Sequence, residues 1–137
     1  MDRAHEIPSE EDAVRRVIEE WARAVRAKDM AGILRNHSPD MLMFDVPPPL
    51  ALKGIAAYEK SWGPFFAWAR QPVTFDIEEM TVTAGADVAF AAASMRCAGH
   101  EASGEDVELE FRLTVGLRKI DGNWVILHEH HSVPAVD

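Results

Sequence analysis

The chain is 137 residues long, 47% hydrophobic and 27% charged, with a formal net charge of −9. This length predicts a single domain spanning residues 1–137 with a real hydrophobic core. The negative field repels phosphate groups, so nucleic acids and anionic membrane surfaces are not expected partners.

Features at the residue level indicate a cytoplasmic protein. No apolar run approaches the roughly 18 residues of a membrane span, and residues 1–12 lack the apolar segment of a signal peptide. Cys97 is the single cysteine, so no internal disulfide is possible, and its neighbours Met95 and Ala98 suggest a packed side chain.

The first predicted element is a helix over residues 9–28. Ser9 is a suitable N-cap, and Asp12 three residues later completes a capping box. The apolar residues that follow recur at helical spacing and form one stripe: Val14, Val17, Ile18, Trp21 and Val25. Asp29 is predicted to cap a second, short helix that ends at Leu34.

A short strand over residues 41–46 is predicted next. Alternation places Leu42, Phe44 and Val46 on one face and Met41, Met43 and Asp45 on the other. The proline run 47–49 cannot pair inside a sheet because proline has no N–H, so it reads as a stiff loop.

A third helix is expected after Lys53-Gly54. Its apolar residues keep helical spacing: Ile55, Tyr58, Trp62, Phe65 and Phe66. Gly63-Pro64 should kink or split this helix.

The remaining sequence predicts four strands. The first, over 73–80, changes phase near Glu79 and suggests a bulge, and the second, over 88–97, is rich in small residues. A long hairpin follows, with the apolar set 109–117 facing inward, a turn at Asp121-Gly122 and a last strand over 124–133.

The last strand carries a polar cluster at residues 128–132. His128, His130 and Ser132 share one face by alternation, and Glu129 and His131 share the other. The pair His128 and His130 is a candidate acid, base or ligand anchor; the alternatives are hydrogen bonds to neighbouring strands or a dimer interface. The register of the hairpin leaves open which face points inward.

The same cluster raises a metal site as an alternative. Two histidines at i and i+2 with a carboxylate can coordinate zinc or iron. The spacing places no third ligand, so no metal and no cofactor are expected.

The element order predicts an α+β fold in which a curved, mostly antiparallel sheet wraps around about three N-terminal helices. Together with four local features, this order resembles the nuclear-transport-factor-2-like superfamily, in its SnoaL-like and ketosteroid-isomerase-like branch. Those features are Ala27-Lys28-Asp29, Asp45 before the proline run, Lys53-Gly54-Ile55, and Asp121-Gly122-Asn123-Trp124 followed by the cluster 128–132. The resemblance implies a cone-shaped fold with a pocket at its open end, and a homodimer through the outer sheet face.

The resemblance also suggests roles for single residues. Asp45 matches the position of the general base in ketosteroid isomerases, whereas Trp21 and Val115 stand where those enzymes carry an oxyanion-hole tyrosine and a protonated aspartate. Tyr58 and Trp62 share a helix face that the family turns toward the cone mouth. The predicted ligand pocket therefore comprises Trp21, Phe44, Tyr58, Trp62 and Val115.

Two functions follow as hypotheses, and the sequence leaves open whether the protein is an enzyme. In the first, a small, mostly apolar organic molecule binds in the cone, and Asp45 with His128 and His130 performs cofactor-independent acid/base chemistry of the isomerase, cyclase or dehydratase type. Tyr58 is another possible proton donor. In the second, the protein is a non-catalytic ligand-binding or dimerisation module, and Asp45 only bonds nearby backbone N–H groups.

Overall fold

The computed structural model describes residues 9–135, so the expectation about a signal peptide in residues 1–12 lies mostly outside this range. Helix α1 spans Glu10–Arg26 and begins at the predicted cap, where the Asp12 N–H donates to Ser9 Oγ at 3.1 Å. Helix α2 spans Met30–Leu34, and the Gly32 N–H donates to its cap Asp29 at 3.2 Å. Both predicted helix starts are confirmed.

Within residues 9–135, six strands form one sheet around these helices. They are β1 (His37–Phe44), β2 (Leu52–Lys53), β3 (Phe75–Ala84), β4 (Val88–His100), β5 (Asp106–Ile120) and β6 (Asn123–Ser132), in the spatial order β2-β1-β6-β5-β4-β3. All neighbouring pairs are antiparallel except β1 with β6, which run parallel. Helix α3 (Ile55–Trp68) connects β2 to β3.

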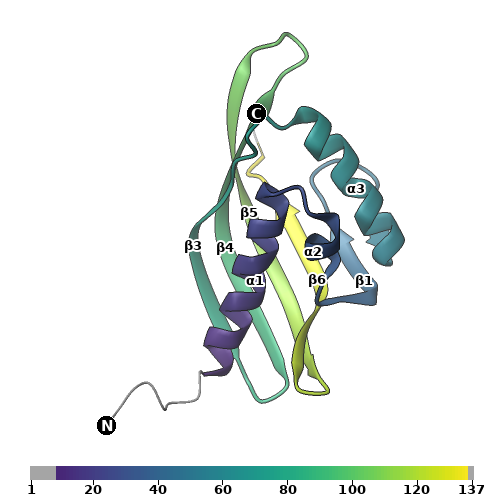
Figure 1. Ribbon diagram of the computed structural model, residues 1–137, viewed down its shortest axis with the longest axis vertical. Coiled ribbons are helices and arrows are strands. Elements are labelled where there is room, and N and C mark those ends of the chain that lie inside the picture. The colour runs from purple at the N-terminus through teal and green to yellow at the C-terminus, as the bar shows by residue number, and fades with distance from the viewer. Residues whose placement is uncertain (1–8, 136–137) are drawn as a thin grey trace.

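The curved sheet turns its inner face toward the helices (Figure 1). Helix α1 lies along this face, α3 flanks β1, and the β4–β5 hairpin extends beyond the other strands (Figure 1). The predicted α+β cone is therefore confirmed. None of the helices within residues 9–135 is both long and apolar enough to cross a membrane.

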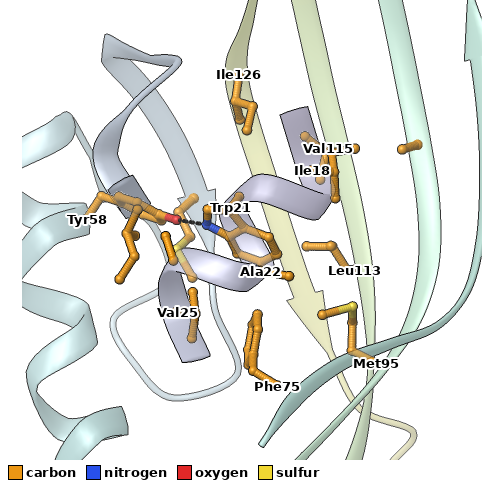
Figure 2. Close-up of a cluster of buried hydrophobic side chains, with 14 of the residues drawn as sticks. Ile18, Trp21, Ala22, Val25, Tyr58, Phe75, Met95, Leu113, Val115 and Ile126 are labelled. Atoms are coloured by element: carbon orange, nitrogen blue, oxygen red, sulfur yellow. Dashed lines mark hydrogen bonds between the residues drawn. The ribbon is translucent and has the colours of Figure 1, made fainter. Parts of the chain in front are cut away.

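The core lies between α1 and the inner sheet face. Figure 2 shows Trp21 of α1 and Tyr58 of α3 pointing toward each other, with Leu113 and Val115 of β5 on the other side of Trp21 from Tyr58. Each of these four side chains is at most 3% exposed. Complete burial of one large apolar side chain stabilises a fold by about 1.5–3 kcal/mol.

The inward faces of two strands are now assigned. In β5 the predicted apolar set is buried from Phe111 to Leu117, while Leu109 is 39% exposed. In β1, Met41 and Met43 are the buried residues, so the face that carries Asp45 is the inner one.

The start of β1 and the course of α3 differ from the expectations. Strand β1 begins at His37 rather than at residue 41, and it tolerates Pro39 because the β1–β6 pairing is interrupted between His37 and Leu42. Helix α3 continues through Pro64, so of the expected kink or split the split does not occur. Trp62 and Phe65 on either side of the proline both pack on Phe75, with ring centroids 5.7 Å apart, and this packing offsets the lost helix hydrogen bond.

A β-bulge in β6 determines which histidines point into the cone. The two-residue turn at Asp121 and Gly122, with φ of 50° and 83°, pairs Leu117 with Ile126, and both are buried. The register then shifts, so that Gly116 faces His128 and Leu127 is the extra residue. Beyond this shift the inward positions of β6 are Glu129 and His131, which are 0% and 7% exposed.

Candidate functional site

A largely apolar cavity of about 310 Å³ lies between the second half of α3 and the sheet end where β1 and β6 stop and β3 starts. Its wall contains the side chains of five aromatic residues, and Asp45 and His131 are its titratable groups besides Cys97. The full lining comprises Met43, Asp45, Val46, Pro47, Ser61, Trp62, Pro64, Phe65, Trp68, Phe75, Cys97, Leu109, Phe111 and His131. Such a volume is in the range of pockets for small organic molecules.

Asp45 and His131 reach the cavity together because β1 and β6 are parallel. Phe44 pairs with His130, so the next residue of each strand follows on the same side and at the same end of the sheet. Asp45 Oδ1 lies 3.8 Å from His131 Nδ1, and the two side chains are 21% and 8% exposed. Asp45 Oδ1 also accepts a hydrogen bond from the Val46 N–H at 2.8 Å.

Behind His131 lies a buried hydrogen-bond network centred on Glu129. His131 Nε2 lies 2.9 Å from Glu129 Oε1, while His37 Nε2 and the Tyr58 hydroxyl lie 2.5 and 2.7 Å from Oε2. The Trp21 indole N–H donates in turn to the Tyr58 oxygen at 2.8 Å (Figure 2). The chain of donors therefore runs from α1 through α3 to the sheet.

The charge state of Glu129 is set by these partners. Burial alone would raise the pKa of Glu129, but the hydrogen bonds from His131 and His37, and the charges on these histidines, hold its pKa at about 2. The pKa of Tyr58 is raised well above its ordinary value, chiefly by burial and then by the neighbouring Glu129 charge. Glu129 is therefore a carboxylate that only accepts, and Tyr58 is a neutral phenol that donates to it.

Both ring nitrogens of His37 face acceptors. Nε2 lies against the Glu129 carboxylate, and Nδ1 lies 3.2 Å from the Arg35 carbonyl oxygen. An imidazolium satisfies both contacts, because each ring nitrogen then carries a proton. In this form His37 balances the charge of Glu129 inside the protein.

The two histidines grouped by the sequence pattern do not line the cavity. His128 and His130 lie on the opposite face of β6, where both rings pack edge-on against Phe44 with centroids 4.9 and 5.4 Å away. His128 Nδ1 also lies 2.7 Å from the Leu42 carbonyl oxygen, one of the strand contacts considered as an alternative.

The residues predicted to form one pocket lie in different parts of the structure. Trp62 lines the cavity, whereas Trp21, Tyr58 and Val115 lie in the core and are not part of the wall. Phe44 packs beside the outward histidines. Tyr58 is committed to Glu129, so it is not free to donate to a ligand.

The sequence did not identify His37 as a site residue. It also did not show that Glu129 and His131, rather than His128 and His130, point into the cone. Residue 37 reads as part of the break after α2, and only the parallel pairing with β6 brings it to Glu129. The alternation did group Glu129 with His131, but the bulge that turns this pair inward has no clear sequence signal.

Two other groups bear on possible chemistry. Cys97 is buried in the cavity wall, and burial raises the pKa of its thiol to about 11, so it is present as a thiol. Within residues 9–135, no three histidine, cysteine or acidic side chains are arranged to hold a metal ion.

Comparison with known proteins places the chain in a family. A model of the SnoaL-like domain matches residues 14–136. No curated protein matches the chain.

Similar solved structures share the fold. An NTF2-like protein of unknown function from Pseudomonas putida KT2440 is 34% identical, with 92% of this chain and 87% of that chain covered and a TM-score of 0.81. A ketosteroid isomerase-like protein from Erwinia carotovora atroseptica is 16% identical, covering 94% and 100%, with a TM-score of 0.77. The association domain of CaMKII from C. elegans is 21% identical, covering 88% and 92%, with a TM-score of 0.68. The match over residues 14–136 shows that this chain belongs to the SnoaL-like domain family.

Proposed function

We propose that the protein binds a small, mostly apolar organic molecule in the cavity beside α3 and transfers protons to or from it without a cofactor. One observation carries this proposal: Asp45 and His131 converge within 3.8 Å on the wall of an otherwise apolar cavity. A carboxylate and an imidazole at this spacing can take a proton from a bound molecule and return it at another atom. Isomerisation, cyclisation and dehydration all fit this pattern.

The roles differ from the pairing expected from sequence. Asp45 keeps its expected role as general base, but the partner imidazole is that of His131 rather than His128 or His130. Glu129 orients His131 from behind, as an acidic residue orients the histidine of other acid/base sites.

The test is a turnover screen with apolar ketones, polyketide-like rings and epoxides, followed by variants. Asp45→Asn and His131→Asn are each expected to lower turnover of a substrate found in the screen by roughly 10²–10⁴-fold. Asp40→Asn, a change of the same kind at an exposed position of β1, should leave turnover unchanged. Full turnover by Asp45→Asn would refute its role as general base.

A non-catalytic ligand-binding module is the second candidate. The hydrogen bond from the Val46 N–H to Asp45 favours it, because a carboxylate held by its own loop also fits a purely structural role. A molecule that binds in the cavity but never turns over would support this candidate.

We also propose that the protein forms a homodimer through the outer sheet face. Phe90 and Val88 of β4 are 52% and 57% exposed, and large exposed apolar side chains on a sheet are commonly covered by a partner. The association domain of CaMKII shares this fold.

A further inference from the structure

The polar side chains of the cavity wall present hydrogen-bond acceptors. Asp45 is the only lining residue with a formal negative charge, and no lysine or arginine lines the cavity. Its carboxylate receives one hydrogen bond, from the Val46 N–H, and a carboxylate can accept several more.

His131 adds a second acceptor because Glu129 fixes its tautomer. Glu129 is a carboxylate, so the proton of the 2.9 Å contact belongs to His131 Nε2. In the neutral form of His131 this leaves a lone pair on Nδ1, the nitrogen that faces Asp45.

The side-chain donors of the wall are already used or covered. The Ser61 hydroxyl donates to the Tyr58 carbonyl oxygen at 2.5 Å. The Trp62 indole nitrogen is buried and has no hydrogen-bond partner among the described residues. The Cys97 thiol is a weak donor.

The rest of the wall suits a flat ring. Phe65 packs against Trp62, Trp68 and Phe75 with ring centroids 5.4, 6.0 and 5.7 Å away, and Phe111 packs against Phe75 at 5.7 Å. Aromatic walls favour stacked or edge-on contacts with planar ligands. An anionic ligand would meet the Asp45 carboxylate, and no lysine or arginine lines the cavity to offset it.

We infer that the cavity selects planar ring compounds that donate an O–H or N–H hydrogen bond to Asp45 and His131 and carry no anionic group, such as phenols and aromatic amines. This inference rests on the proposed function and narrows its ligand class.

Four ligands of similar shape test the inference by calorimetric titration of the full chain at neutral pH. They are 2-naphthol, 1-naphthylamine, 2-methoxynaphthalene and 2-naphthoate. The methoxy compound keeps the ring and the oxygen of the naphthol but lacks its donor. The naphthol and the amine are expected to bind about tenfold or more tightly than the methoxy compound, and the carboxylate should bind most weakly.

Variants show which residues cause the preference for ligands that donate a hydrogen bond. Asp45→Asn replaces one acceptor oxygen with a donor, and His131→Phe keeps a planar ring without Nδ1. Each should reduce the advantage of naphthol over methoxynaphthalene about fivefold or more, while Asp40→Asn leaves it unchanged. Asp45→Asn provides the test if His131→Phe does not fold.

The outcomes separate the two proposals. Tighter binding of the naphthol or the amine than of the methoxy compound supports the inference. Which of the two binds more tightly shows whether the site prefers phenols or aromatic amines. If the methoxy compound or the carboxylate binds as tightly as both donors, the inference is overturned while ligand binding in the cavity stands. If none of the four binds, the proposed function fails together with the inference.

Discussion

Glu129 accepts hydrogen bonds from three side chains while shut off from water, so its charge controls how His37, Tyr58 and His131 are oriented. A buried carboxylate in such a setting is stable only while all of its donors stay in place. The His131 ring that faces the cavity depends on it for both position and tautomer.

Replacing Glu129 with glutamine should destabilise the protein by roughly 3–5 kcal/mol. The glutamine amide turns an N–H₂ group toward donors, and His37 loses its counter-charge. Urea unfolding followed by tryptophan fluorescence measures the change. Glu110→Gln, the same substitution at an exposed position of β5, is the control and should have little effect.

The low pKa of Glu129 also predicts how stability depends on pH. Its pKa is about 2 in the folded protein against a reference value of 4.5, so the unfolded chain binds the proton more readily. The carboxylate therefore stabilises the fold by roughly 3 kcal/mol above pH 4.5. This contribution is lost as the pH falls from 4.5 toward 2.

Unfolding free energies measured in urea between pH 6 and about pH 3 test whether stability falls on acidification as predicted. The loss of stability on acidification should be smaller in Glu129→Gln than in the wild type. An equal loss in both proteins would mean that another group is responsible.

At the scale of elements, most of the fold follows from local signals. Ser9, Asp29 and Asp121-Gly122 fix two helix starts and one hairpin, and the alternation over 109–117 identifies the buried face of β5. The site depends instead on an irregularity. Regular alternation from Ile126 would turn His128 and His130 inward, and the extra residue Leu127 reverses this.

The contact of His37 with Glu129 was equally inaccessible to sequence reasoning. It joins residues 92 positions apart through parallel pairing, and no local pattern encodes such a contact. The convergence of Asp45 with His131 has the same origin.

Two single-residue deletions in β6 should have very different effects. Deleting Leu127 removes the bulge and leaves Ile126, Glu129 and His131 on the inner face. Deleting His130 makes Glu129 and His131 neighbours of opposite orientation, so no register keeps both inside. The second deletion should cost about 3 kcal/mol more in unfolding free energy, measured in urea.

The deletion of Leu127 is the matched control here, because it shortens the same strand by the same amount. Equal losses from the two deletions would contradict the importance of the inward pair.

At the scale of the whole molecule, the two faces of the sheet have different surroundings. Its inner face holds the network and the cavity, and its outer face exposes Val88 and Phe90. The proposed dimer would cover the outer face and leave the cavity free for a ligand.

Phe90→Asp should convert the proposed dimer to a monomer, because a charge would be buried at the interface. Light scattering during gel filtration measures the mass. Leu50→Asp, at a loop position that is 95% exposed, should leave the dimer intact. A wild-type protein that is monomeric at high concentration would contradict the proposed dimer.

The most direct test of the site is the position of the proton on the neutral His131 ring in the ligand-free protein, read from nitrogen-15 NMR across a pH series. The structure predicts a proton on Nε2 and a bare Nδ1, and Glu129→Gln should remove this preference. A proton found on Nδ1 with Nε2 bare would contradict the account, because His131 would then present no acceptor to the cavity.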